Sequence, residues 1–236
     1  MLKGEFNKND IDSEIQCNVI NEQGKSIKCN QKKYKRFSDH IGKFPIIIIS
    51  PTDTNLILEG SEVRRRYIDS SIAQYKKSYL QILIRYNKTL KQRNSLLKQF
   101  SERNFFDKTN LEIYDNQLIK LGNIIHVERT TFLTQLKPVF NKYYNNISSG
   151  NEEVKLVLKS QINNNNYSEL LKASLDKDRL SNYTNFGIHK DDIHFYMNEV
   201  LIKKIGSQGQ QKSFLIALKL AQFDFIKNEI GFNPIL

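Results

Sequence analysis

Cysteine is scarce in this chain of 236 residues, which contains two cysteines, Cys17 and Cys29. Two cysteines cannot build the disulfide framework of a small secreted domain, so a reducing, cytoplasmic setting is expected. Long apolar runs are also missing: the longest, residues 46–49, is far too short to cross a bilayer, and no membrane partner is expected. Residues 1–6 lack the apolar core of a signal peptide, which fits the same setting.

Acidic residues are few relative to basic ones. The 25 Asp and Glu residues oppose 36 Lys and Arg residues, which leaves a formal net charge of +11 at pH 7. Such an excess favours an anionic partner, and nucleic acid is the commonest. Because 39% of the residues are hydrophobic and 26% are charged, the composition excludes a disordered polyelectrolyte and a fibre. We therefore expect a soluble, folded protein that binds DNA or RNA.

The first fifty residues show the alternation of apolar and polar side chains that is typical of strands. A hairpin is predicted, with a turn at residues 21–24 and with both cysteines on its apolar face. That face consists of Ile15, Cys17, Val19, Ile27 and Cys29. The β-branched run at residues 44–49 predicts a strand that is buried on both faces.

From Ser61 onwards the apolar residues recur every three or four positions, which predicts one long helix that extends to about Phe100. A second long helix is predicted from Thr109, which begins a Thr-x-x-Glu capping box, to Pro138, which should end or kink it. A polar loop at residues 101–107 joins them, so the two helices should pack antiparallel as an arm.

The strand pattern returns beyond Gly150. Strands are predicted at residues 154–158 and 193–197, a short helix at 168–180, a final helix at about 208–228, and a loop at the four asparagines of 163–166. Strands, a helical arm, strands and a helix thus follow one another. This order predicts an α/β body with an inserted helical arm rather than two domains in series.

Basic residues are concentrated in the first long helix. Residues 61–100 contain ten of them and two acidic residues, so this segment carries +8 of the net charge. An excess of this size favours a surface that contacts DNA phosphates without reading the bases, with a solvated helix face as the alternative. The first of these cations lie near a helix N-terminus, where they are unfavourable without an acidic neighbour. The candidate DNA-binding residues are Arg64, Arg65, Arg66, Lys76, Lys77, Arg85, Lys88, Lys91 and Arg93.

Two short polar segments lie near the end of the chain. Ser207 is a good N-cap, and Gly209 lets another backbone approach a helix start whose free N–H groups suit an anion. Taken alone, however, this segment is better explained as an ordinary capped helix. His189, Asp191 and Asp192 lie within four residues. They do not define the geometry of a metal site, so no metal is expected.

These segments also carry a family resemblance. Residues 207–211 have the form of the ABC-type ATPase signature of the RecF family, and residues 187–192 resemble the Gly-x-His-Arg/Lys-Asp-Asp block that precedes it. Further blocks follow the family's order and spacing at residues 50–53, 60–69, 85–87 and 91–94. The resemblance extends over residues 44–236 and rests on several motifs in the correct order.

The resemblance implies an ABC/SMC-like ATPase head with an inserted helical lobe. Residues 1–55 would be a β-rich part of the head, residues 56–145 the helical arm, and residues 146–236 the return to the head. RecF proteins bind ATP and Mg²⁺ in an ATP-dependent homodimer and hold duplex DNA and single/double-strand junctions without sequence preference. With RecO and RecR they help RecA load at single-stranded gaps, in DNA repair, recombination, replication and the SOS response.

The resemblance also assigns site residues. The signature residues Ser207, Gln208, Gly209, Gln210 and Gln211 would contact ATP held by the opposite subunit, with Ser207 and Gly209 on its γ-phosphate. His189, Lys190, Asp191, Asp192 and Asp53 would lie near the head interface. No catalytic residue is assigned.

The chain departs from the family pattern at both ends. The P-loop motif is missing, because the one Gly-Lys-Ser, residues 24–26, has Val19 at the first glycine position and falls in the predicted hairpin. The sequence stops at residue 236, before the acidic Walker B pair. We therefore expect an internal fragment that neither binds ATP and Mg²⁺ tightly nor hydrolyses ATP alone. A nucleotide-independent basic helical module that binds DNA or protein is the alternative, and another SMC-like head protein is a third interpretation.

Overall fold

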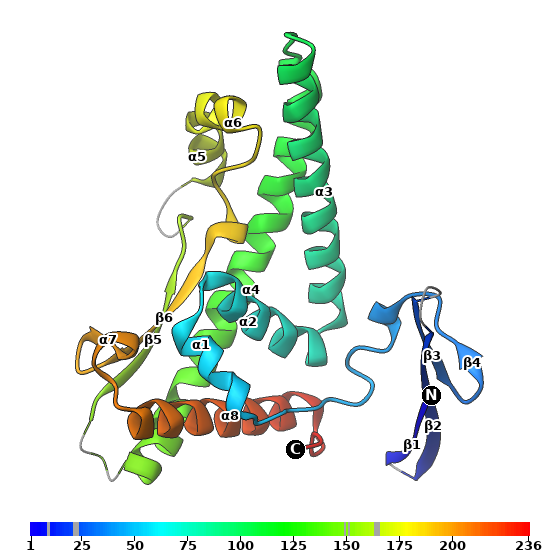
Figure 1. Ribbon diagram of the computed structural model, residues 1–236, viewed down its shortest axis with the longest axis vertical. Helices are drawn as coiled ribbons and strands as arrows, with labels where there is room; N and C mark the ends of the chain where they lie inside the picture. Colours follow the sequence, from blue (N-terminus) through cyan, green and yellow to red (C-terminus); the bar gives the residue numbers. More distant parts are fainter. Residues whose placement is uncertain (9, 21–23, 149, 151, 163–165) are drawn as a thin grey trace. The chain divides into compact units, whose positions relative to one another are not determined.

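The computed structural model describes residues 1–8, 10–20, 24–148, 150, 152–162 and 166–236. They form two compact units, Met1–Pro45 and Ile46–Leu236 (Figure 1). No helix among the described residues is both long and apolar enough to cross a membrane. The division of the chain into two head parts and an arm stays a prediction.

The first unit is an antiparallel meander. Its strands are β1 (Leu2–Lys8), β2 (Ile11–Ile20), β3 (Gly24–Cys29) and β4 (Lys32–Lys33), paired in chain order and followed by the 3-10 helix η1 (Phe37–Asp39). The pairs Ile15↔Cys29 and Cys17↔Ile27 confirm the predicted hairpin and place both cysteines on one face. Residues 21–23 of the predicted turn lie outside the described residues.

The second unit combines helices with a small sheet. The 3-10 helix η2 (Pro51–Thr54) leads into α1 (Asn55–Leu58), α2 (Ser61–Tyr75), α3 (Lys77–Glu102) and α4 (Lys108–Ser148). The sheet has the order β5-β6-β7, with β5 (Val154–Lys159), β6 (Asp192–Met197) and β7 (Val200–Leu201). Between and after these strands lie α5 (Tyr167–Ala173), α6 (Leu175–Ser181), η3 (Ile188–Lys190), α7 (Ile202–Ile205) and α8 (Gln208–Ile230).

Helices α3 and α4 lie side by side as the predicted antiparallel arm, and α8 crosses the base of α4 (Figure 1). Aromatic rings fill the crossing: Phe132 packs edge-on against Phe225 at 5.0 Å, and Phe140 against Phe214 at 4.8 Å between ring centroids. Phe132, Phe140 and Phe214 have no exposed surface. Because these rings belong to one cluster of buried hydrophobic side chains, the arm base and α8 share one core.

The predicted long helix of residues 61–100 is in fact two helices. The break lies at Lys76, whose backbone (φ −122°, ψ 89°) is not helical and whose ammonium group pairs with Glu128 of α4 at 2.6 Å. Pro138 does not end the second predicted helix, because α4 continues through it to Ser148. Buried neighbours along this stretch, including Leu136 and Phe140, offset the roughly 3 kcal/mol that an interior proline costs.

Two other local predictions need correction. The backbone N–H of Asn110 bonds to the carboxylate of Asp107 at 3.0 Å, so Asp107 caps α4 in place of Thr109. Residues 44–49 do not form a strand buried on both faces. Ile46 makes a single parallel bridge with Ile235, and Ile47 is buried, whereas Ile46, Ile48 and Ile49 are exposed.

Candidate functional site

The signature segment, residues 207–211, begins helix α8 with a defined set of hydrogen bonds. Ser207 is the N-cap: its hydroxyl accepts from the N–H of Gln210 at 3.2 Å, and the side-chain carbonyl of Gln210 accepts from the N–H of Ser207 at 2.7 Å. Gln211 donates to the carbonyl of Gly206 at 2.9 Å. A Cβ at Gly206 would lie 2.8 Å from the carbonyl oxygen of Ile202, so glycine is required there. The predicted N-cap is therefore confirmed and is part of a full capping box.

The first turn of α8 is open to a ligand. Ser207, Gln208 and Gly209 are exposed, and a Cβ built on Gly209 would meet nothing nearer than the Ser207 hydroxyl at 3.9 Å. The hydroxyl of Ser207 accepts one hydrogen bond and keeps its own proton to donate. Together with the N–H groups that point out of a helix start, this geometry suits a phosphate oxygen.

The block that precedes the signature is buried in ion pairs. Arg129 of α4 binds both carboxylate oxygens of Asp69 at 2.9 Å and the carboxylate of Asp191 at 2.9 Å. The carbonyl of Asp191 accepts from Arg65 at 2.7 Å. Burial raises the pKa of Asp191, and the cation of Arg129 opposes that shift. Asp191 has no exposed surface, and the placement of this block near a head interface stays a prediction.

Neighbouring residues of the block are equally engaged. Arg64 binds both oxygens of Asp192 at 2.7 and 3.0 Å, which supplies the acidic neighbour that a cation at a helix start requires. His189 bonds through Nδ1 to the hydroxyl of Tyr86 at 2.9 Å and through Nε2 to the carbonyl of Thr184 at 3.0 Å. Burial lowers the pKa of His189 to about 4, so the imidazole is neutral at pH 7. Among the described residues no cluster of His, Cys, Asp and Glu could hold a metal ion.

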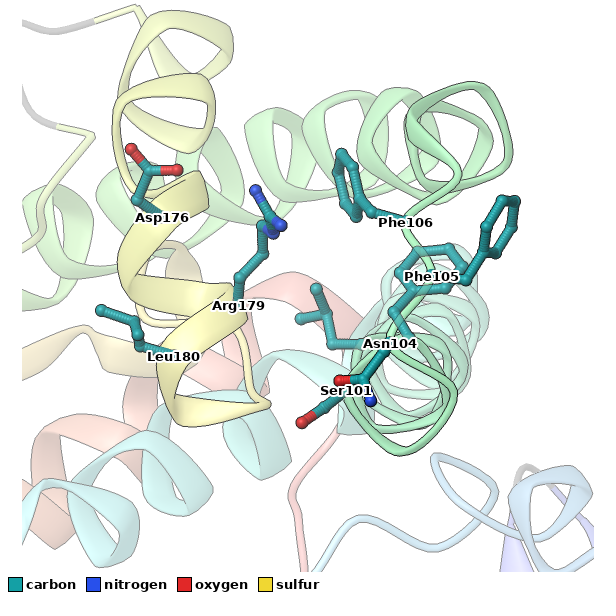
Figure 2. Close-up of a pocket in the computed structure, with 9 residues that line it drawn as sticks. Ser101, Asn104, Phe105, Phe106, Asp176, Arg179 and Leu180 are labelled. Atoms are coloured by element: carbon teal, nitrogen blue, oxygen red, sulfur yellow. The ribbon is translucent and has the colours of Figure 1, made fainter.

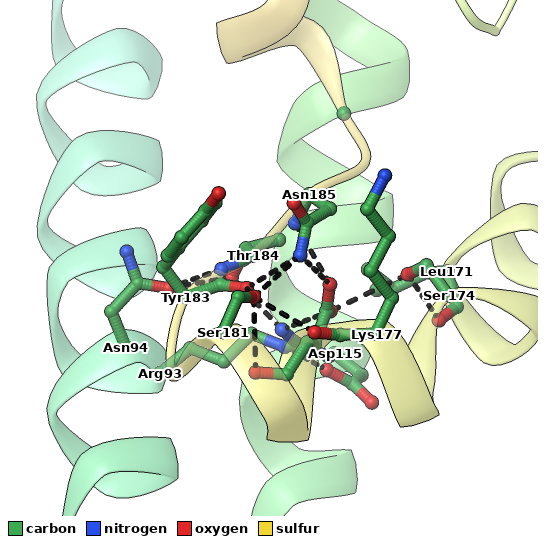
Figure 3. A network of polar contacts seen from close by, with 12 residues as sticks. Arg93, Asn94, Asp115, Leu171, Ser174, Lys177, Ser181, Tyr183, Thr184 and Asn185 are labelled. Atoms are coloured by element: carbon green, nitrogen blue, oxygen red, sulfur yellow. Dashed lines mark hydrogen bonds and ion pairs between the residues drawn. The ribbon is translucent and has the colours of Figure 1, made fainter.

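Arg93 forms the centre of a second buried network, which joins the arm to α6 (Figure 3). Its guanidinium binds Asp115 at 2.5 Å, Asp178 at 2.7 Å and the hydroxyl of Thr184 at 2.9 Å. The side chains of Arg93 and Asp178 have no exposed surface. Arg93 therefore cannot contact DNA, and its inclusion in the predicted DNA-binding set is corrected.

The remaining predicted DNA-binding residues differ in exposure. Arg64 and Arg65 are half-buried in the contacts above, Lys76 pairs with Glu128, and Arg66 is exposed but pairs with Glu62. Four others are exposed along α3, and no ion pair to them is found among the described residues. They are Lys77, Arg85, Lys88 and Lys91.

Asp53 lies at the edge of a hollow on the second unit. Its carboxylate accepts from the N–H of Ser50 at 2.8 Å and pairs with Lys219 of α8 at 2.8 Å. The hollow measures about 420 Å³ and is partly lined by Asp53, Lys219 and the buried Gln222. Lys219 was not predicted from the sequence, because nothing near position 219 indicates a partner 166 residues earlier.

A larger hollow of about 540 Å³ lies at the arm tip, between the α3–α4 loop and α6 (Figure 2). Phe105 and Phe106 line one side, and the guanidinium of Arg179 lies over the Phe106 ring at 4.3 Å from its centroid. Phe105 is 62% exposed and Leu180 is 87% exposed. This cation–π contact is a second link between α6 and the arm, in addition to the Arg93 network.

Comparison with known proteins identifies the family. No family model matches the chain. The DNA replication and repair protein RecF of Flavobacterium johnsoniae is 47% identical over all 236 residues, and that of Azobacteroides pseudotrichonymphae is 42% identical over the same length. The chain is a RecF homologue. It spans 66% and 64% of the length of these two RecF proteins.

Solved RecF structures agree with this result. A structure of the recombination mediator protein RecF with ATP, from the RecFOR pathway, superposes with a TM-score of 0.91 at 31% identity, over 99% of this chain and 65% of that one. A second RecF structure gives a TM-score of 0.89 at 30% identity, over 98% of this chain and 65% of that one. The predicted fold class is confirmed: the mixed α/β fold with long helices matches part of the RecF ATPase head.

Proposed function

We propose that this RecF homologue binds DNA through one face of α3 and contacts, through the start of α8, the nucleotide of a second ATPase head. In this role it belongs to a RecF-type recombination mediator that acts with RecO and RecR to help RecA load at single-stranded gaps. ATP and Mg²⁺ would be held by the partner head, and the chain itself would not hydrolyse ATP.

The observation that carries the DNA-binding proposal is the basic face of α3, defined as Lys77, Arg85, Lys88 and Lys91. At 3.6 residues per turn these four positions fall within an arc of about 120°. Tyr79, Tyr86 and Arg93 occupy the opposite side of the helix and are fully buried. The four cations of the basic face are therefore presented to solvent, which suits a backbone of phosphates.

Physical chemistry also supports the nucleotide contact. A serine hydroxyl with a free proton, an exposed Gly209 and the positive end of a helix dipole combine in one turn of α8. Phosphate oxygens, such as those of a nucleoside triphosphate, are among the anionic ligands that suit such a turn. Residues 207–211, which resemble the signature motif of the family, lie at the same turn.

Titration of a labelled duplex with the protein at several salt concentrations tests the DNA-binding role. We expect the logarithm of the affinity to fall linearly with the logarithm of salt concentration. A variant with Lys77, Arg85 and Lys88 changed to Ala should lower that slope by about 3, because each lost phosphate contact removes about 0.9. The effect should be the same on duplexes of different sequence.

The matched control changes Lys137, Lys142 and Lys227 to Ala, which removes the same charge from exposed positions on α4 and α8. We expect the control to retain most of the affinity and the slope. Equal losses in both variants, or binding that does not depend on salt, would refute the assignment to α3. ATP turnover by the purified chain would contradict the second half of the proposal.

A further inference from the structure

We propose that Glu152 is a positioning residue for the signature segment, and that it links the base of arm helix α4 to the first turn of α8. The inference rests on the proposed function, in which that turn contacts a nucleotide. It adds a residue that lies 55 positions before Ser207 and outside every motif of the sequence.

The first half of the link is the side-chain amide of Gln210. Its carbonyl oxygen accepts from the N–H of Ser207, and its NH₂ group donates to Oε1 of Glu152 at 2.5 Å. An amide turned around would place its oxygen against the carboxylate, which is repulsive. Glu152 therefore fixes the orientation in which Gln210 can cap the helix start, and through the capping box it fixes the position of Ser207.

The second half is Tyr144, in the last turns of α4. Its hydroxyl donates to Oε2 of Glu152 and lies 3.7 Å from the sulfur of Met197 in β6. The Tyr144 ring has no exposed surface, and burial, together with this bond, raises the pKa of its hydroxyl, so it stays a donor. One carboxylate thus receives one bond from the arm helix and one from the signature segment.

The backbone next to Glu152 is also held in place. The N–H of Glu153 donates to the side chain of Asn198 at 3.0 Å, and the N–H of Asn198 donates to the carbonyl of Glu153 at 2.8 Å. Asn198 lies between β6 and β7, so the sheet holds the backbone next to Glu152. A displacement of the end of α4 relative to this sheet changes the distance from Tyr144 to Glu152, and Gln210 follows.

Hydrogen exchange tests the link without a nucleotide. In Glu152→Ala we expect the amides of Gln210 and Gln211 to exchange about fivefold faster, which is the effect of weakening a helix cap by roughly 1 kcal/mol. Glu152→Gln keeps an oxygen acceptor for Gln210 and should retain most of the protection. Amides in the centre of α8, such as that of Leu218, should be unchanged in both. Unchanged exchange at Gln210 and Gln211 in Glu152→Ala would overturn the inference.

Association with a full-length RecF protein in the presence of ATP tests the functional consequence. We use the Flavobacterium johnsoniae relative as the nucleotide-bearing head and compare Ser207→Ala, Glu152→Ala and the neighbouring control Glu153→Ala, whose exposed side chain pairs with Lys155. Weaker association of Ser207→Ala and Glu152→Ala, with Glu153→Ala unaffected, supports the inference. Loss in Ser207→Ala alone overturns it and leaves the proposed function standing. No association of the unaltered chain, or no effect of Ser207→Ala, refutes the proposed function itself.

Discussion

Replacement of Arg93 by Met should destabilise the arm and leave DNA binding nearly intact. The methionine side chain fills most of the same volume but removes the cation between Asp115 and Asp178. Removal of one partner from a buried ion pair costs about 3–5 kcal/mol, because the remaining charge loses its compensation. Asp178 keeps the N–H of Asn185 at 2.8 Å and its amide at 3.0 Å, so we expect a value near the lower limit.

A loss of about 3 kcal/mol corresponds to a fall of roughly 6–12 °C in Tm for a unit of this size. Thermal unfolding followed by circular dichroism measures it. A double-mutant cycle with Asp178→Asn should show a coupling of at least about 1 kcal/mol, because the second change removes the uncompensated charge. DNA affinity, measured well below Tm, should change by less than about twofold, since a buried guanidinium contributes little to phosphate binding.

The opposite result would refute this reasoning. If Arg93→Met melts at the same temperature but binds DNA several-fold more weakly, the guanidinium is a DNA ligand and the network of Figure 3 contributes no stability. If the effects of the two single substitutions on the free energy of unfolding simply add, the pairing of Arg93 with Asp178 contributes nothing to stability.

Three further perturbations probe other parts of the site. The pKa of His189 is about 4 in the folded protein, below its ordinary 6.5, so its contribution to stability is present above pH 6.5 and is lost as the pH falls towards 4. Urea titrations should therefore give a free energy of unfolding about 2 kcal/mol lower at pH 5 than at pH 7. His189→Gln should remove that difference. Gly187→Ala places a Cβ 2.3 Å from the Tyr167 hydroxyl at φ +136°, so calorimetry should show a loss of about 3 kcal/mol, and an unchanged Tm would argue against this clash. Lys219→Met leaves Asp53 unpaired and should lower stability by about 1–3 kcal/mol, most of which Asp53→Asn should restore; no recovery would exclude the ion pair as the cause.

Local sequence patterns were enough to predict the N-terminal hairpin and the start of α8. The spacing of Ile15, Cys17 and Ile27 indicates the hairpin, and Ser207 before an apolar run indicates the start of α8. The break at Lys76 could not be predicted in this way, because no Gly or Pro marks it. Its fixed partner Glu128 is 52 residues away and becomes adjacent only when the arm has formed.

The basic residues illustrate what charge counting misses. The sequence assigned Arg93 and Lys88 to the same DNA-binding set, although Arg93 follows Tyr79 and Tyr86 at seven-residue spacing and so falls on the buried side of the helix. That spacing could have predicted that Arg93 is buried. The partners of Arg93, Asp115 and Asp178, could not be predicted, because they come from two other helices.

Two arginines, the buried Arg129 and the half-buried Arg64, lie between the two surfaces proposed to bind ligands. Arg129 joins α4 to Asp69 of α2 and to Asp191 before β6, while Arg64 joins α2 to Asp192 of the same strand. Removal of the Asp191 carboxylate would leave the buried cation of Arg129 with one partner fewer, at a cost of several kcal/mol. The arm that carries the basic face is therefore tied to the sheet at its base, and Glu152 extends that tie to α8. DNA phosphates on α3 and a nucleotide at the α8 start would then act on one connected body, so the two ligands have a physical path by which the affinity for one depends on the other.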